Sequence, residues 1–289
     1  MAKAKQLQDI NKKPLTPQRV IIVILKYIVI IASSAVMIVP FLWMLSSSFK
    51  NNLDVFNFPI QWIPNPVKFD NYSYIWEKAN YIVLFGNTIK LTVIITLLQL
   101  FTCSLAAYAF SKIIYPERDK LFLAYLATLM VPFQVIMIPQ FIIIKNLGLT
   151  DSHLALILIQ AFSPMGVFLL KQFYMTIPNE LSEAARIDGL NEFGIYSRII
   201  LPLAKPTLAS LTIFTSVTVW NDFLAPLIYL STSSKYTIQL GLRNMISENT
   251  AEYAPIMAAS VISLIPILIV FIACQKFFVE GTTSGAVKG

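Results

Sequence analysis

Residues 174–206 read YMTIPNELSEAARIDGLNEFGIYSRIILPLAKP and separate two long apolar segments. Connections between helices are commonly only a few residues long, so this one has room for structure of its own. Pro178 and Asn179 mark a helix start. Gly189 is a typical helix stop, and Asn191 can cap a second short helix. The segment therefore predicts a helix–glycine–helix element.

The composition around this segment is that of a membrane protein. The chain has 289 residues, of which 56% are hydrophobic and 13% charged, with a mean hydropathy of +0.69. A soluble domain carries far more charge on its surface. The net charge is +7, but the basic residues stand at the ends of apolar segments rather than on one polar face. This distribution argues against a nucleic-acid partner.

Six apolar segments are candidates for membrane spans, which need about 20 residues each. We expect them at residues 20–45, 91–111 (beginning earlier, near 81), 121–144, 154–170, 206–230 and 253–275. The predicted fold class is an all-α integral membrane protein. Prolines fall within several spans, at Pro40, Pro132, Pro139, Pro164, Pro226 and Pro266. They indicate a bent, closely packed bundle, and the alternative is that some kinks serve as gate hinges.

Basic residues predict the orientation of the spans. With six spans both termini lie on one side, and that side carries fourteen lysines and arginines against six on the other. The positive-inside rule then places both termini and the 174–206 loop in the cytoplasm. We expect a cytoplasmic tail at 1–19, a first span with an extracellular loop at 20–80, a core of five spans at 81–280, and a second cytoplasmic tail at 281–289.

The loop carries a motif of fixed spacing, E-A-A-x3-G-x9-I-x-L-P. Its specified positions are Glu183, Ala184, Ala185, Gly189, Ile199, Leu201 and Pro202. In this motif the chain resembles the permeases of binding-protein-dependent ABC importers. Trp220-Asn221-Asp222-Phe223-Leu224 and the ending from Phe278 to Gly289 resemble the carbohydrate-uptake branch, above all the second permease of maltose-type systems.

The resemblance implies a six-helix type I ABC importer transmembrane domain with cytoplasmic coupling helices. The loop would dock on a cytoplasmic ATPase, with Glu183 against a basic residue, Asp188 as a further carboxylate and Gly189 at the bend. The implied partners are a second homologous permease, two ATPase subunits, an extracellular solute-binding protein and the lipid bilayer of a prokaryotic plasma membrane. The tail residues Ala286, Val287, Lys288 and Gly289 would reach the ATPase dimer.

Polar residues within the spans are candidates for a translocation path. Asp222 is the only acidic residue inside an expected span, and Asn221 precedes it. Sugar sites combine carboxylates and amides with aromatic faces, so Asn221, Asp222 and Gln134 could line the path. The alternative for each is hydrogen bonding between packed helices, which also applies to Gln99 and Gln160.

The sequence lacks the groups for catalysis or metal binding. It contains no G-x-x-x-x-G-K-[ST] phosphate loop, so ATP and Mg²⁺ are expected on the partner ATPase rather than on this chain. His153 is the only histidine, and Cys103 and Cys274 lie far apart in apolar runs. These residues predict neither a metal site nor a disulfide framework.

The predicted function is therefore the permease subunit of an ATP-driven importer of a sugar or oligosaccharide, without enzymatic activity of its own. A permease of the same type for an amino acid, phosphate or peptide stays open. A gradient-driven carrier and a membrane enzyme fit less well, since carriers usually show several charges within spans. The 174–206 loop could also be an amphipathic hairpin at the membrane surface without a partner.

Overall fold

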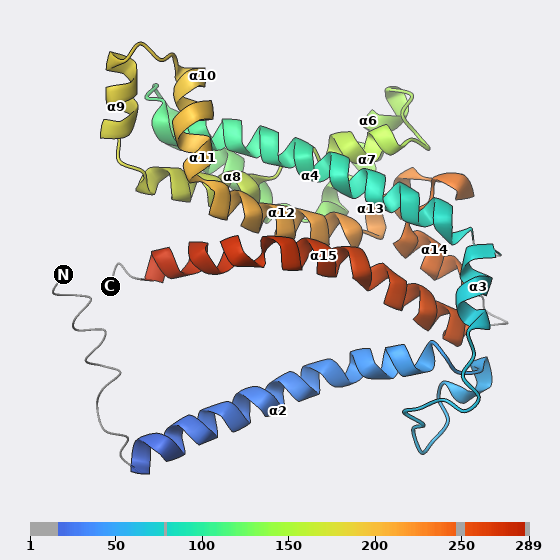
Figure 1. Ribbon diagram of the computed structural model, residues 1–289. Coiled ribbons are helices and arrows are strands. Elements are labelled where there is room, and N and C mark those ends of the chain that lie inside the picture. The colour runs from blue at the N-terminus through green and yellow to red at the C-terminus, as the bar shows by residue number, and fades with distance from the viewer. Residues whose placement is uncertain (1–16, 78–79, 247–251, 287–289) are drawn as a thin grey trace.

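The computed structural model describes residues 17–77, 80–246 and 252–286, and its elements are helical (Figure 1). In chain order these are α2 (Pro17–Ser47), η1 (Asn52–Asp54), α3 (Asp70–Glu77), α4 (Tyr81–Lys112), α5 (Arg118–Ala127), η2 (Thr128–Met130), α6 (Phe133–Asn146), α7 (His153–Ile159), α8 (Pro164–Thr176), α9 (Glu180–Ile187), α10 (Glu192–Ile195), η3 (Tyr196–Ile200), α11 (Leu201–Leu203), α12 (Lys205–Trp220), α13 (Leu224–Tyr229), η4 (Ser233–Lys235), α14 (Ile238–Asn244) and α15 (Tyr253–Ala286).

Among the described residues, three helices are long and apolar enough to cross a membrane: α2, α4 and α15. The start of α4 at Tyr81 agrees with the earlier beginning expected for the second span. Three further pairs of helices are long and apolar enough when each bent pair is taken as one span, which allows up to six spans. They are α5–η2 with α6, bent by 100°, α7 with α8, bent by 43°, and α10–α11 with α12, bent by 77°.

Three of the expected spans, the third, the fourth and the fifth, are broken, in line with the bent bundle that their prolines indicate. The third breaks at Pro132 and the fourth between Gln160 and Ser163, while the fifth ends its first helix at Trp220. Proline lacks a backbone donor and disfavours helix in the residue before it. Pro132 accordingly precedes α6, and Pro164 is the first residue of α8, where a missing N–H has no cost.

Polar side chains of α4 satisfy the break between α7 and α8. Gln99 Nε2 donates to the Gln160 carbonyl at 2.7 Å, and Thr102 Oγ1 donates to the Ala161 carbonyl at 2.8 Å. The break also sits close to α4, because a Cβ at Gly166 would lie 2.9 Å from Cys103 Sγ. Small residues permit such close approach of helices in a membrane.

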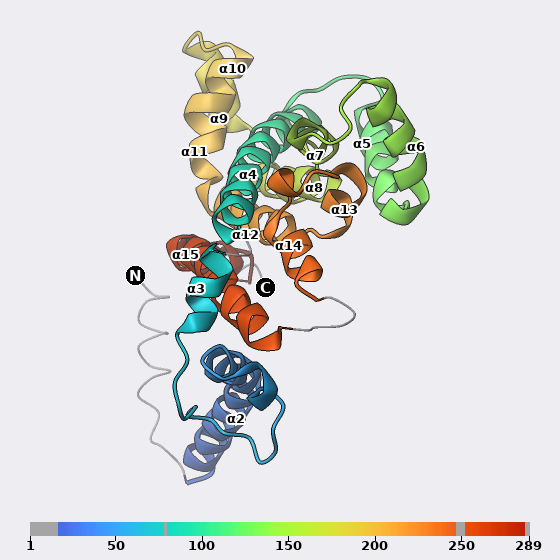
Figure 2. The ribbon, with the colours of Figure 1, turned by 90° about the vertical axis from the view of Figure 1, so that its right-hand side faces the viewer.

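Helix α4 is the centre of the packing. It runs beside α12 and α8, and α15 packs on the other side of α12 (Figures 1 and 2). One buried cluster joins α4, α8, α9 and the α10–α12 region and includes Tyr108, Leu170 and Ile200. Two more lie toward the opposite end of α4, around Leu156 and around Tyr81.

Helix α2 diverges from this bundle. It meets α15 at one end and moves away toward Pro17 (Figure 1). Near the meeting point the ring of Phe56, in the segment that follows α2, lies 4.8 Å from the ring of Tyr253. None of the most apolar stretch of α2 is buried. A long apolar helix of this kind requires lipid or another protein around it.

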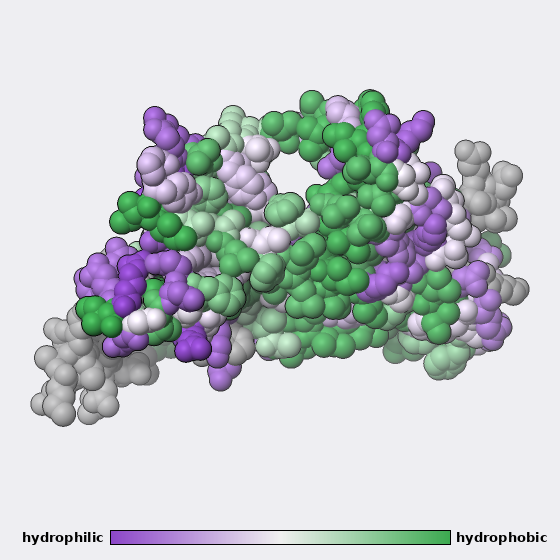
Figure 3. All heavy atoms as spheres, turned by 90° about the horizontal axis from the view of Figure 1, so that it is seen from above, coloured by the Kyte–Doolittle hydropathy of each residue, from purple (hydrophilic) through white to green (hydrophobic). Residues whose placement is uncertain are grey.

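The surface has the distribution of a membrane protein. Viewed from above, hydrophobic residues fill the middle of the molecule and hydrophilic residues gather toward both ends (Figure 3). The Pro17 end of α2 and the Ala286 end of α15 point toward the side that carries α9 and α10 (Figure 1). Helix α15 also continues to Ala286, past the boundary expected at residue 280.

At the opposite end, Asp151 fastens the α6–α7 turn to the segment after α13. Its carboxylate accepts from Thr232 Oγ1 at 2.6 Å, from the Ser231 and Thr232 N–H groups, and from Lys235 Nζ at 2.9 Å. The Thr232 hydroxyl first, and then the Ser231 N–H and Lys235, hold the pKa of Asp151 well below its ordinary value. The carboxylate therefore contributes stability that is present above its unfolded pKa of about 3.9 and is lost as pH falls through the lower folded pKa.

We expect Asp151→Asn to lower the Tm of the purified protein by a few degrees, since an amide cannot replace the charge beside Lys235. The loss should be equal at pH 8 and pH 5, because Asp151 stays ionised at both. Thermal unfolding in detergent measures it, with the exposed Asp119, bonded to the adjacent Arg118, changed to Asn as control. A loss that disappears already between pH 8 and pH 5 would contradict the assignment.

Candidate coupling site

The helix–glycine–helix element forms as the sequence predicts. Helix α9 ends in a Schellman motif, in which Leu190 N donates to Ala185 O at 2.9 Å and Gly189 N to Arg186 O at 3.1 Å. Gly189 has φ +82°, a left-handed conformation that suits glycine. Asn191 Oδ1 accepts from Gly194 N at 2.8 Å, which confirms the expected cap. The second arm continues from α10 through η3 to α11.

An ion pair holds the two arms together. Arg186 Nε on α9 donates to Glu192 Oε1 on α10 at 2.9 Å. Arg186 first, and then the Tyr108 hydroxyl, keep the pKa of Glu192 below its ordinary value. The bend at Gly189 is thus reinforced by a side-chain contact across it. The element therefore has a defined shape.

The motif residues divide into an exposed set and a packed set. Glu183 and Ala184 are exposed on α9, Asp188 is exposed directly after it, and Pro202 is exposed at the end of the second arm. The packed set is Ala185, which is 4% exposed, together with Ile199 and Leu201, which pack against the cluster around Tyr108. The motif therefore combines exposed residues with residues that attach the element to the bundle.

Sequence reasoning missed the apolar side chains of this contact face. Ile187 is 87% exposed, Phe193 is 65% exposed and Leu181 is 44% exposed. Large apolar residues on a protruding element indicate a surface that another protein covers. Only their position beside the motif could have identified them, since apolar residues are common throughout this chain.

Asp222 lies between two helix breaks. Its Oδ2 accepts from Gln160 Nε2 at 2.8 Å, and its Oδ1 accepts from Ala225 N at 3.2 Å at the start of α13. The backbone carbonyl of Gln160 in turn accepts from Gln99 Nε2 of α4. Gln99 Oε1 accepts from Thr215 Oγ1 of α12 at 3.0 Å. The carboxylate therefore has the packing contacts of the alternative interpretation, whatever its role in transport.

The other expected path residues are not gathered around Asp222. Asn221 is exposed and donates from Nδ2 to the Val217 carbonyl at 2.9 Å. Gln134 is exposed on α6, which lies at the edge of the molecule (Figure 2). Of the expected tail contacts, Ala286 closes α15, and residues 287–289 lie outside the described residues.

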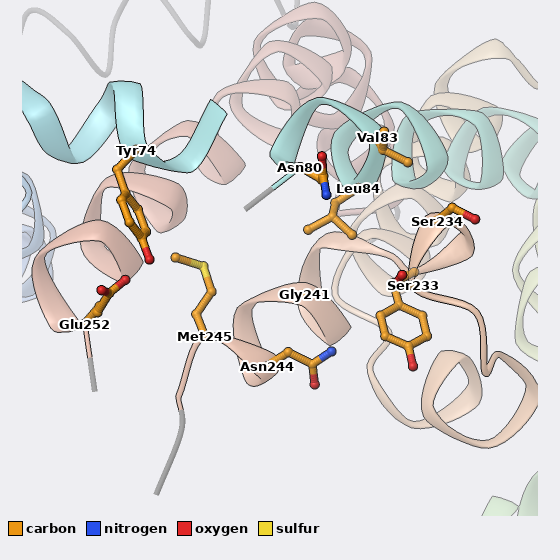
Figure 4. Close-up of a pocket in the computed structure, with 11 residues that line it drawn as sticks. Tyr74, Asn80, Val83, Leu84, Ser233, Ser234, Gly241, Asn244, Met245 and Glu252 are labelled. Carbon is orange, nitrogen blue, oxygen red and sulfur yellow. The ribbon is translucent and has the colours of Figure 1, made fainter. Parts of the chain in front are cut away.

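A pocket of about 550 Å³ lies at the end opposite α9, between α3, α4 and α14 (Figure 4). Tyr74 points toward Glu252 on one side of it, and Asn80, Asn244 and Ser234 line the other parts. Its floor is close-packed, since a Cβ at Gly241 would collide with the Leu84 side chain. Aromatic, amide, hydroxyl and carboxylate groups thus meet in one depression, which the sequence alone did not reveal.

Comparison with known proteins identifies the family. Residues 116–283 match the family described as the binding-protein-dependent transport system inner membrane component. The chain belongs to this family. The matched stretch contains the whole motif from Glu183 to Pro202. The match confirms the resemblance drawn from the motif.

Two relatives illustrate the family, and both are permease proteins of transport systems. The arabinooligosaccharides transport system permease protein AraQ of Halalkalibacterium halodurans is 35% identical over 253 residues, covering 86% of this chain and 91% of the relative. The sn-glycerol-3-phosphate transport system permease protein UgpE of Yersinia enterocolitica is 35% identical over 239 residues, covering 80% and 85%. The chain is therefore a multi-pass membrane permease.

A solved structure confirms the expected fold class. It is a crystal structure of a bacterial ABC transporter involved in the import of the acidic polysaccharide alginate. The TM-score is 0.81 at 24% identity, and the alignment covers 92% of this permease and 100% of the solved chain. Likeness at this identity establishes the fold.

We expect Gly189→Ala to destabilise the permease by about 1 kcal/mol, because a side chain disfavours left-handed backbone. No atom lies within 4 Å of the added Cβ, so the cost comes from the backbone alone. Asn tolerates this conformation better, so Gly189→Asn should lose less. Thermal unfolding measures both. Gly86→Ala is the control, because Gly86 is helical and equally unobstructed; an equal loss there would contradict the explanation.

Proposed function

We propose that this permease is the membrane subunit of an ATP-driven importer of a sugar or oligosaccharide. The observation that carries the proposal is the complete motif displayed on a rigid, protruding helix–glycine–helix element at one end of the bundle. The permease itself supplies the path and the coupling element, whereas ATP and Mg²⁺ belong to partner ATPase subunits. This assignment places α9 and both termini in the cytoplasm of a prokaryotic cell.

The exposed face of α9 is suited to docking in a cleft of the ATPase. Glu183 offers a carboxylate for a basic residue, and Ala184 lets a partner approach the backbone. Ile187 then supplies the apolar anchor, since full burial of such a side chain stabilises an interface by about 1.5–3 kcal/mol. ATP-driven closure of two ATPase subunits would move α9, and the bundle would change access from inside to outside.

The second homologous permease is the partner proposed for α2. This helix is apolar along its length and unburied by its own bundle. It diverges from α15, and a second subunit of the same type could fill the space between them (Figure 1). Close helix packing would then replace lipid along that face.

The pocket in Figure 4 faces the side from which an extracellular solute-binding protein would deliver its cargo. Its tyrosines, amides and hydroxyls are the groups that recognise sugars. The arabinooligosaccharide relative favours a carbohydrate, and the glycerol-3-phosphate relative supports the second candidate, a small phosphorylated polyol. Stimulation of the complex by binding protein loaded with each solute distinguishes the two.

We expect Glu183→Arg to abolish coupling, because it reverses the charge at the docking face. The permease is expressed together with the products of its neighbouring genes and purified as a complex. ATP hydrolysis and solute uptake by that complex are then measured. Glu117→Arg is the matched control, since Glu117 is also exposed and pairs with Lys120 outside α9. A complex that contains no ATPase, or uptake driven by an ion gradient and indifferent to Glu183→Arg, would overturn the proposed function.

A further inference from the structure

Three polar side chains lie on one face of α4 at its end nearest α9. They are Ser104, Tyr108 and Lys112, spaced four residues apart, so they align along about 12 Å of the helix. All three are buried, being 1%, 4% and 8% exposed. Each contacts a different part of the coupling element, defined here as residues 177–203. We call these three residues the α4 ladder.

Lys112 holds the start of the coupling element. Its Nζ donates to the Ile177 carbonyl at 2.6 Å and to Asn179 Oδ1 at 2.9 Å, immediately before α9. A buried ammonium group needs such acceptors, because an unpaired charge in this position would be costly. The position of the first turn of α9 is therefore tied to the end of α4.

Tyr108 holds the bend. Its hydroxyl donates to Glu192 Oε2 at 2.7 Å, while the other oxygen of Glu192 accepts from Arg186 at 2.9 Å. The hydrogen bond from Tyr108 thus reaches both arms of the element through one carboxylate, because Glu192 lies on α10 and its ion-pair partner Arg186 lies on α9. A movement of either arm acts on the same tyrosine.

Ser104 holds the second arm. Its Oγ is 2.7 Å from the hydroxyl of Tyr196, which is 4% exposed. The rings of Tyr196 and Tyr108 meet edge to face with centroids 5.4 Å apart. Tyr108 is therefore packed directly against Tyr196, the partner of Ser104.

We propose that the α4 ladder transmits movement of the coupling element to α4, and that Tyr108 and Lys112 are its positioning residues. This inference rests on the proposed function. Apolar contacts are non-directional and permit sliding, whereas hydrogen bonds at three successive turns fix one register. Helix α4 then carries the movement inward, because Gln99 bonds to the α7–α8 break and Thr215 of α12 bonds to Gln99.

The test compares solute taken up per ATP hydrolysed by the intact complex in lipid vesicles. Tyr108→Phe removes a single oxygen and leaves the ring packing in place. We expect a ratio lower by about tenfold or more, as for the loss of one hydrogen bond to a charged group, with unchanged assembly and unchanged ATP hydrolysis. Lys112→Met should act in the same direction, and Lys112→Arg should restore part of the ratio.

A matched control lies in the same buried cluster. Tyr174 of α8 is fully buried, and its hydroxyl has no hydrogen-bond partner among the described residues. Tyr174→Phe therefore removes the same atom without breaking a contact, and its ratio should equal that of the wild type. A role of the tyrosine hydroxyls in folding alone would change assembly or Tm rather than the ratio.

The outcomes separate this inference from the proposed function. If Glu183→Arg uncouples the complex while Tyr108→Phe and Lys112→Met keep the wild-type ratio, the ladder is overturned and the function stands. If Glu183→Arg has no effect, the proposed function itself fails. If Lys112→Met lowers the yield of complex, the ratio measured for Tyr108→Phe alone tests the ladder, since that substitution leaves the charge balance unchanged.

Discussion

A membrane interior offers no hydrogen bonds to the backbone, and this constraint governs the whole structure. The bundle contains broken helices, so every break needs a donor or acceptor from within the protein. Helix α4 supplies these groups at the α7–α8 break through Gln99 and Thr102, and Gln160 connects that break to Asp222. The central position of α4 follows from this requirement as much as from its length, because polar side chains on a lipid-facing helix would have no partners.

The sequence predicted the coupling element more fully than the bundle. Gly189 and Asn191 act through local backbone geometry, which depends on neighbours a few residues away. The spans were located by hydrophobicity, which is high on both sides of Pro132 and on both sides of the polar pair Asn221 and Asp222, and which does not show that the helices break there. Proline signals a possible kink, whereas the observed angle depends on which helices pack around it.

The polar residues of the spans show the same limit. Gln99, Gln160 and Asp222 were recognisable as unusual, yet their two interpretations could be compared only once their partners were known. Nothing in the sequence distinguishes Tyr108 and Lys112 as contacts of the coupling element, because tyrosine and lysine are ordinary at the end of a span. Their four-residue spacing gains meaning only when α10 is seen beside α4, a contact between residues more than eighty positions apart.

The divergence of α2 has a consequence for how much of this subunit a cell can maintain. A subunit that leaves a long helix without protein neighbours is more stable when a complementary chain occupies that face, and the gain follows mass action. Unequal synthesis of the two chains would leave the surplus copies in a weaker state. If α2 packs against the proposed second permease, matched supply of both subunits becomes a condition for the abundance of either one.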